Sequence, residues 1–233
     1  MKKIEVRVFS FMAVPKNFLA CLCPEGIYHV YNRTNNKEPL FHSEANKLFF
    51  LQRYELFVQP FVTTYAFSLL NNHFHLLIRV NSQESIVRAV KRVLAERLTD
   101  KEKQLLANPD ADCSCNYFLE WQFLRFFTSY SMSFNRVHKR KGNLFHKPFK
   151  RVLIEKDNQF TSTLLYIHLN PVKHGLVECA SKYQWSSLAQ YLTGVPGLVN
   201  TAFGINWFGG LKRFEETHKS AEFFVNLQKG FAF

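Results

Sequence analysis

Two neighbouring apolar stretches, separated by an asparagine pair, most constrain what this chain can fold into. The first covers about residues 61–69, and the second, residues 73–80, reads His-Phe-His-Leu-Leu-Ile-Arg-Val and follows Asn71-Asn72. Their length and aliphatic content favour buried strands over helices. Because the connection between them is so short, we predict that they pair as an antiparallel hairpin.

The second stretch carries two histidines on one side. Alternate side chains of a strand share a face, so His73 and His75 lie together with Leu77 and Arg79, and the other face is entirely apolar. Imidazole is the commonest protein metal ligand, so the pair suits a metal site. Taken alone, such a pair is more often structural or solvent-facing, and a metal site needs a third ligand.

The composition indicates a folded and basic protein. The chain has 233 residues, of which 47% are hydrophobic and 25 are Phe, enough for a large core. Lys and Arg number 30 against 18 Asp and Glu, a net charge of +12. This excess favours a polyanionic partner, with nucleic acid first and an acidic membrane surface second. A generally basic protein with no such partner is the alternative.

Localisation follows from the amino terminus and the cysteines. Glu5, Arg7 and Pro15 interrupt the first apolar stretch, so it does not make a signal peptide, and no window reaches the length of a membrane span. The five cysteines lack the C-x₂-C spacing of zinc fingers, although two C-x-C pairs leave a four-cysteine site as an alternative. We therefore predict a soluble cytoplasmic protein with reduced thiols.

Periodicity and turn signals divide the chain into a leader (1–25), a core (26–192) and a C-terminal extension (193–233) that looks looser and carries one short helix. Residues 99–117 are polar and read as an inserted loop. Pro171 is expected to end a helix at Asn170. The core should contain strands at about 26–33, 61–69, 73–80 and 149–155, and helices at about 44–58, 84–98, 120–138 and 157–170.

Residues 136–151 form a basic segment without a single acid. Basic side chains pair with phosphates and aromatic faces stack on bases, so the segment suits single-stranded nucleic acid. The alternative is a solvated basic turn with Phe145 and Phe149 buried. Its cations are Arg136, Lys139, Arg140, Lys141, Lys147, Lys150 and Arg151.

Tyr166 and Asn170 lie four positions apart on the last predicted helix, about 40° from each other around its axis. The pair alone is most simply a packed tyrosine and a helix-terminal amide. Together with His73 and His75, however, an amide oxygen could complete a site for a divalent ion that polarises a phosphodiester. The tyrosine hydroxyl could then attack the phosphorus. These ligand types do not identify the metal.

These residues carry a resemblance to a known family. His73-Phe74-His75 resembles the HUH motif, in which two histidines flank a hydrophobic residue. Residues 166–177, YIHLNPVKHGLV, closely resemble the tyrosine-helix signature of single-tyrosine transposases, especially the REP-associated tyrosine transposases. Residues 28–33, 142–150 and 183–187 are similar to the opening strand, basic segment and closing element of that family, in the same order.

The resemblance implies a ferredoxin-like α+β fold over residues 26–192, with an antiparallel sheet flanked by helices. It also implies that Tyr166 attacks single-stranded DNA at hairpin-bearing sites and leaves a 5′-phosphotyrosine and a free 3′-OH. His73, His75 and Asn170 would bind Mg²⁺ or Mn²⁺. The expected protein is a monomer or a homodimer in the cytoplasm, associated with the nucleoid.

The expected DNA contacts are the seven cations of the basic segment together with Arg33, Phe145 and Lys173. Two other functions remain open. One is a domesticated protein that binds nucleic-acid hairpins without transposition, and the other is a metal-dependent nuclease that uses water as its nucleophile.

Overall fold

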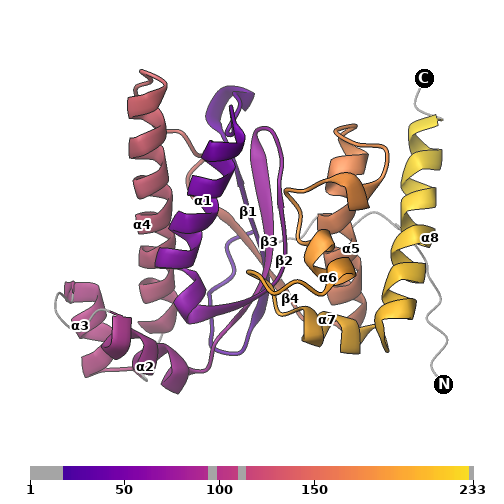
Figure 1. Cartoon of the computed structure of the whole chain (residues 1–233). Helices are drawn as coiled ribbons and strands as arrows, with labels where there is room; N and C mark the ends of the chain where they lie inside the picture. The colour runs from indigo at the N-terminus through magenta and orange to yellow at the C-terminus, as the bar shows by residue number, and fades with distance from the viewer. Residues whose placement is uncertain (1–17, 94–98, 110–113, 231–233) are drawn as a thin grey trace.

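The computed structural model describes residues 18–93, 99–109 and 114–230. Its centre is a four-stranded antiparallel sheet with the strand order β2-β3-β1-β4, and helices cover both faces (Figure 1). The predicted ferredoxin-like α+β fold is therefore confirmed. The strands are β1 (Ile27–Arg33), β2 (Val62–Leu69), β3 (His73–Val80) and β4 (Lys150–Ile154).

Strand β3 lies inside the sheet and separates two unlike faces. It pairs with β2 as the predicted hairpin and with β1 on its other side. Phe74 is fully buried, and its ring packs 4.9 Å from Phe50 and 5.9 Å from Phe127, measured between ring centroids. His75 faces the opposite way, toward Tyr166. The alternation read from the sequence is therefore confirmed.

The apolar face of the sheet is covered by α1 (Glu44–Phe57) and α4 (Ser114–Val137). The Ser43 side chain caps α1 by accepting the N–H of Asn46. Aromatic rings of both helices, including Phe50 and Phe127, pack against Phe74 of β3. A 3₁₀ turn at Asn35–Lys37 (η1) follows β1, and another at Gln59–Phe61 (η2) follows α1.

Residues 99–117 are not the loop that their polarity predicts. After α2 (Gln83–Val93), helix α3 (Asp100–Ala107) occupies half of this stretch. Glu102 caps its start by accepting the N–H of Thr99 at 2.6 Å, and the same buried carboxylate accepts a hydrogen bond from Arg125 at 2.8 Å. The Thr-x-x-Glu spacing is a sequence signal for a helix start, and this signal outweighs the polarity of the segment.

Helix α5 (Asp157–Lys173) covers the histidine face and runs past Pro171 instead of ending at Asn170. Pro171 lacks only its own N–H, and the N–H of His174 still donates to the Asn170 carbonyl at 2.9 Å. The helix ends where Gly175 adopts a φ of +68°. There the N–H groups of Gly175 and Leu176 donate to the carbonyls of Val172 and Pro171, a Schellman motif.

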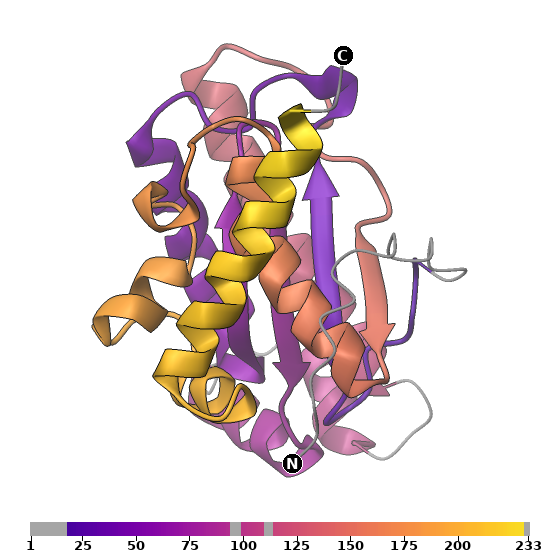
Figure 2. The ribbon, with the colours of Figure 1, turned by 90° about the vertical axis from the view of Figure 1, so that its right-hand side faces the viewer.

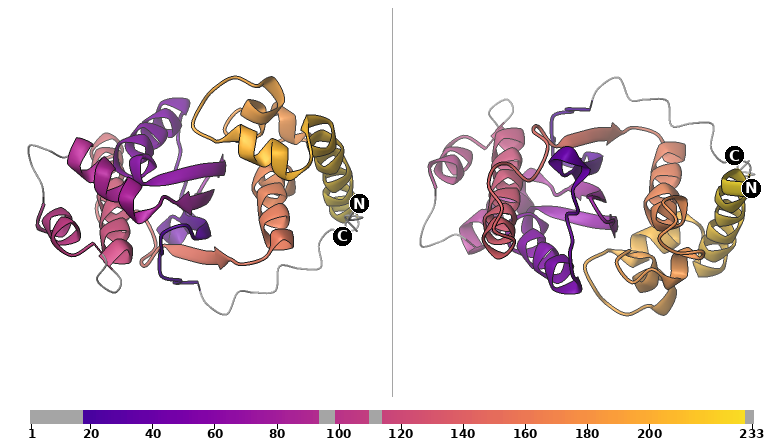
Figure 3. Two further views of the ribbon diagram at one scale, coloured as in Figure 1. Left: turned by 90° about the horizontal axis from the view of Figure 1, so that it is seen from below. Right: turned by 90° about the horizontal axis from the view of Figure 1, so that it is seen from above.

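The C-terminal extension is a packed layer and not the looser tail that its glycines predict. The turn η3 (Ala180–Lys182) is followed by α6 (Leu188–Thr193), α7 (Thr201–Trp207) and α8 (Leu211–Gly230). In Figure 2, α8 lies over α5, and α6 and α7 lie beside it. Phe208 and Phe214 are buried, and the Trp207 indole donates to Thr161 at 3.0 Å. In Figure 3, α1–α4 lie on one side of the sheet and α5–α8 on the other.

Residues 18–20 of the predicted leader run beside β4. The N–H of Ala20 donates to the Arg151 carbonyl, and the N–H of Arg151 donates to the Phe18 carbonyl at 2.7 Å. The rest of the predicted leader, residues 1–17, lies outside the described residues. Within the described part of the chain, no helix is both long enough and apolar enough to span a bilayer.

Candidate metal and tyrosine site

The pairing of β1 with β3 brings two polar faces together. In the register, Tyr31 lies opposite His75 and Arg33 lies opposite His73. Directly paired residues contact each other across a sheet, and the ring centroids of Tyr31 and His75 are 5.6 Å apart. His29 precedes Tyr31 by two positions and shares its face. Sequence reasoning missed both His29 and Tyr31, although strand alternation and antiparallel pairing could have placed them here.

A buried imidazole pair forms the floor of the site. His29 and His75 are each 5% exposed, and Nε2 of His29 lies 2.9 Å from Nδ1 of His75. Burial lowers the pKa of His29 to about 3. Burial, and then the nearby His29 and His73, lower the pKa of His75 well below its usual value. Both rings are therefore neutral at pH 7, the state that metal ligation requires.

His73, the other imidazole of β3, is partly exposed. Its Nδ1 lies 2.8 Å from Oδ1 of Asn72, and because an amide oxygen only accepts, Nδ1 carries the proton. Burial lowers the pKa of His73 to about 4, with smaller contributions in the same direction from His174 and Arg33 and an opposing one from Asn170. The ring is neutral at pH 7, and its lone pair is on Nε2.

Asn170 brings an unsatisfied amide to the same place. The residue is fully buried, yet neither polar atom of its side chain has a hydrogen-bond partner within the described protein, and Nε2 of His75 likewise has none. Buried polar atoms are almost always paired, so unpaired ones indicate a water or an ion. Two imidazole Nε2 atoms and one amide oxygen form a set of ligands that fits a divalent cation.

Within the described part of the chain, no metal site is made only of the more common ligand types, His, Cys, Asp and Glu. Among the described residues, no group of three or more His, Cys, Asp or Glu could hold a metal ion. The His174 ring lies 5.0 Å from that of His73 without completing such a group. A metal held by His73 and His75 would therefore need the Asn170 amide as its third protein ligand.

Tyr166 lies one helical turn before Asn170 and beside the imidazole pair. Its ring meets that of His75 edge-on, with centroids 5.3 Å apart, and that of His29 at 6.0 Å. The Lys173 ammonium lies 5.2 Å from the centroid of the tyrosine ring. Tyr166 is only partly buried, so a tyrosine hydroxyl, two imidazoles, an amide and a cation share one partly open site.

Seven exposed cations lie at one end of the sheet, which we call the basic end. Here β1 ends, β3 begins and helices α4 and α5 end (Figures 1 and 2). The loop before β4 belongs to the same end, because the N–H of His146 donates to the Arg33 carbonyl at 3.0 Å. The basic end consists of Arg33, Lys37, Arg136, Lys139, Lys141, Lys147 and Lys173. Of these, sequence reasoning missed Lys37.

The structure corrects two of the expected DNA contacts. Phe145 is 5% exposed and packs 5.0 Å from the Phe127 ring, so it cannot stack on a base from the surface. Arg151 is 7% exposed, and its guanidinium pairs with Glu120 and donates to the Ala20 carbonyl at 2.7 Å. A neutralised, buried guanidinium cannot reach a phosphate without losing these partners.

Two further members of that set are partly engaged within the protein. Arg140 pairs with Glu38 and donates to the carbonyls of Gly142 and Asn143, so it holds the α4–β4 connection together. The half-buried Lys150 has its Nζ 5.3 Å from the Phe18 ring centroid. The remaining expected cations are the exposed members of the basic end.

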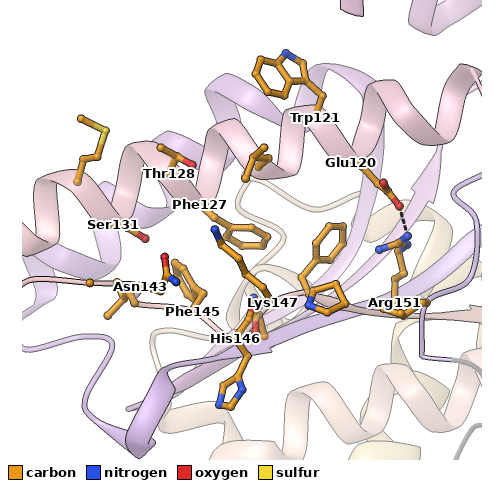
Figure 4. Close-up of a pocket in the computed structure, with 18 of the residues that line it drawn as sticks. Glu120, Trp121, Phe127, Thr128, Ser131, Asn143, Phe145, His146, Lys147 and Arg151 are labelled. Carbon is orange, nitrogen blue, oxygen red and sulfur yellow. Dashed lines mark hydrogen bonds and ion pairs between the residues drawn. The ribbon is translucent and has the colours of Figure 1, made fainter.

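A separate cavity of 810 Å³ lies between α4 and the chain from Gly142 to Phe149. Lys147 extends toward α4 across it, whereas the His146 ring points away (Figure 4). At the far end the Glu120–Arg151 ion pair borders the cavity. Neither Tyr166 nor the imidazoles of β3 line this cavity, so it is distinct from the metal and tyrosine site.

Comparisons with known proteins add one structural likeness. No family model matches the sequence, and no curated protein sequence matches it. Among solved structures, the chain is similar to a REP-associated tyrosine transposase bound to a REP hairpin, with a TM-score of 0.50 and 13% sequence identity. The match covers 78% of this chain and 88% of the other. At this identity the likeness shows a shared fold.

Proposed function

We propose that this chain is a metal-dependent DNA transposase that cleaves and rejoins single-stranded DNA beside a hairpin. The observation that carries the proposal is the meeting of Tyr166 with His73, His75 and Asn170 around buried polar atoms that have no protein partner among the described residues. A solved structure with this fold, a tyrosine transposase bound to a REP hairpin, supports the same interpretation.

Tyr166 would be the nucleophile. Its oxygen attacks a backbone phosphorus, and the P–O3′ bond breaks, so one fragment becomes linked to the tyrosine through its 5′-phosphate and the other ends in a 3′-OH. The phenol loses its proton as the new bond forms, and the departing 3′ oxygen gains one. Attack of a 3′-OH on the phosphotyrosine reverses the exchange. One P–O bond replaces another in each direction, so rejoining needs no ATP.

His73, His75 and Asn170 would hold Mg²⁺ or Mn²⁺ beside that tyrosine. When bound, the ion supplies polarisation of a phosphodiester oxygen and stabilisation of the charge that develops at phosphorus. The protein's own contribution is rigidity, because two ligands belong to an interior strand and the third to a helix packed on it. The hydroxyl and the ligands thus keep a constant spacing.

The basic end would bind the DNA backbone. Its seven cations are exposed, and lysine and arginine attract phosphates by a sequence-independent electrostatic interaction. Lys173 is close enough to the Tyr166 ring to contact a phosphate that Tyr166 attacks. Hairpin recognition would then depend on the shape of the DNA as well as on these charges.

A covalent-adduct assay tests the proposal. The protein is incubated with hairpin-bearing single-stranded DNA and Mn²⁺, and the reaction is analysed by denaturing electrophoresis. The wild type should form an SDS-resistant protein–DNA adduct, and Tyr166→Phe should form none. Tyr31→Phe is the matched control, because Tyr31 also faces His75 and is also partly buried. It should retain the adduct.

Each of the other outcomes would indicate a different function for this chain. Hairpin binding without cleavage would identify a binding protein, and cleavage without an adduct would identify a nuclease that activates water. An adduct that persists in Tyr166→Phe and disappears in Tyr31→Phe would identify Tyr31, on β1, as the nucleophile.

A further inference from the structure

The direction of the hydrogen bond between His29 and His75 determines which nitrogen of His75 carries its proton. Nε2 of His29 lies 2.9 Å from Nδ1 of His75, and the two rings are inclined by 32°. A neutral imidazole carries one N–H and one lone pair. Therefore only one of the two rings donates in this bond, and the choice determines what the other nitrogen of His75 presents to the site.

The two directions leave different atoms buried without a partner. If His29 donates, His75 carries its own proton on Nε2, which has no partner among the described residues. That arrangement buries an orphaned N–H. If His75 donates through Nδ1, its Nε2 holds a lone pair instead. Orphaned buried N–H groups are rarer in proteins than unsatisfied acceptors, so the burial favours His75 as the donor.

The neighbouring ligand shows the same arrangement with an unambiguous partner. Nδ1 of His73 bonds to Oδ1 of Asn72, which can only accept, and the Asn72 amide nitrogen donates to the Lys37 carbonyl. His73 therefore keeps its lone pair on Nε2. With His75 as donor, both imidazoles of β3 would present the same nitrogen, each oriented by an acceptor behind it.

We propose that His29 is a positioning residue for the metal site. It accepts the Nδ1–H of His75 and so keeps the lone pair of His75 on Nε2, facing the space shared with Asn170 and Tyr166. The metal-binding part of this inference rests on the proposed function, whereas the tautomer of His75 does not. Outer partners of this kind orient the histidine ligands of known metal sites.

The position of His29 argues against a purely structural role. It lies on an interior strand at 5% exposure, where an apolar side chain would be buried without any polar cost. His29 makes edge-on contact with the Tyr166 ring and lies 4.9 Å from that of Tyr31, so it touches the site residues directly. The ability of its Nε2 to accept the N–H of His75 explains why a histidine occupies this buried position.

The test compares wild type, His29→Gln and His29→Leu. Glutamine retains an acceptor with similar reach, and leucine fills the space without one. The first measurement is the ¹⁵N NMR shift pattern of the histidine rings in metal-free protein, with His75 assigned by the signals that are missing in His75→Gln. Wild type and His29→Gln should show His75 protonated on Nδ1. In His29→Leu the proton should no longer be confined to Nδ1.

The second measurement is Mn²⁺ affinity by calorimetry, with thermal unfolding as the control for folding. Loss of an outer partner weakens metal binding by about 10- to 100-fold in known sites, so we expect that loss for His29→Leu and near wild-type affinity for His29→Gln. Equal affinity in wild type and His29→Leu would overturn the positioning role, even if DNA cleavage persisted.

The two measurements separate the failure of this inference from the failure of the proposed function. A His75 protonated on Nε2 in the wild type would overturn the inference whether or not metal binds. Nδ1 protonation together with no Mn²⁺ binding would support the hydrogen-bond direction and refute the metal site of the proposed function. If His29→Leu does not fold, the position of the proton on His75 in the wild type still shows which ring donates the hydrogen bond.

Discussion

Two buried imidazole pairs lie on opposite sides of helix α5, and they differ in one respect. Toward the sheet is the pair His29–His75, and toward α8 is the pair His168–His218. Each pair joins two ring nitrogens at 2.9 Å, and all four residues are nearly inaccessible. In the first pair Nε2 of His75 has no partner among the described residues. We call the first the open pair and the second the closed pair.

Every ring nitrogen of the closed pair has a protein partner. Nδ1 of His218 donates to the Phe214 carbonyl at 2.8 Å, so its Nε2 accepts from Nδ1 of His168. Nε2 of His168 then accepts from the Ser187 hydroxyl at 2.8 Å, and that oxygen accepts the N–H of Phe67. This series of hydrogen bonds joins β2, α5 and α8, and it engages all four ring nitrogens of the pair.

The difference teaches how to interpret a buried histidine. The two pairs are equally buried and equally spaced, and the accounting of their ring nitrogens distinguishes them. The closed pair joins elements of the fold, whereas the open pair leaves one ring nitrogen without a partner among the described residues. The following predictions test this contrast by changing one pair while the other stays intact.

The largest effect is expected from removing Nε2 of His75, the unpaired ring nitrogen of the open pair. His75→Leu should weaken Mn²⁺ binding by more than about 100-fold and abolish the DNA adduct, because a ligand is removed outright and not merely reoriented. The same substitution in the closed pair, His168→Leu, should leave Mn²⁺ affinity within about threefold of wild type. Calorimetry with Mn²⁺ and the adduct assay measure both. Equal losses in the two variants would remove the distinction between the pairs.

Acid should destabilise the protein through the closed pair. Burial lowers the pKa of His218 to about 4 and that of His168 well below 6.5. The unfolded chain therefore binds these protons more tightly, so their contribution is complete above pH 6.5 and is lost as the pH falls toward 4. His218 alone should remove about 3 kcal/mol over that range.

Urea unfolding of the metal-free protein between pH 7 and pH 4.5 measures this loss. The double variant His168→Leu/His218→Leu should show a flatter dependence on pH. The open pair and His73 titrate in the same direction and remain in both proteins, so the difference between the two curves belongs to the closed pair. An unchanged slope in the double variant would contradict the prediction.

At constant pH the two pairs should differ in stability. His168→Leu leaves Ser187 and His218 without their partner and should lower the free energy of unfolding by about 2 kcal/mol. His75→Leu breaks one hydrogen bond and leaves Nε2 of His29 unpaired, but it also removes the unpaired Nε2 of His75. The number of unsatisfied buried atoms therefore does not rise, and the substitution should cost less than about 1 kcal/mol. Urea unfolding at pH 7.5 compares them. A larger cost for His75→Leu would show that the open pair is also structural.

The smallest effect concerns the charges of the basic end. Replacing Lys139, Lys141 and Lys147 by Ala should weaken hairpin binding and lower the slope of log affinity against log salt by up to about 0.9 for each phosphate that is no longer neutralised. Arg151 is excluded because its burial makes its removal destabilising. The matched control is Arg88→Ala/Lys91→Ala/Arg92→Ala on α2, at the other end of the molecule (Figure 1). Equal slopes in both triple variants would show that the basic end does not bind phosphates.

Local patterns in the sequence predicted which side chains share a face on β3 and on α5. The two-residue period of a strand separates His75 from Phe74, and the helical period puts Asn170 beside Tyr166; both follow from backbone geometry that neighbours along the chain impose. The same reasoning failed at Pro171, because one missing N–H did not outweigh the packing of α5. It also failed at residues 99–117, where a capping signal was overlooked.

Local patterns could not predict the contacts between segments that are distant in the sequence. Phe145 and Arg151 belong to a segment whose composition suits DNA, but burial depends on which other elements cover each side chain, and here α4 covers Phe145 while Glu120 neutralises Arg151. The C-terminal extension has the glycines of a loose tail, yet its aromatic residues pack against α5.

The sequence by itself determined the fold class, the strand that carries His73 and His75, and the helix that carries Tyr166 and Asn170, since these depend on periodicities within single segments. Only the tertiary structure decided which of the nine histidines have all their nitrogens satisfied. Hydrogen bonds such as those of His29 with His75 and of His168 with His218 join residues far apart in the chain, and their partners exist only once the strands and helices have packed.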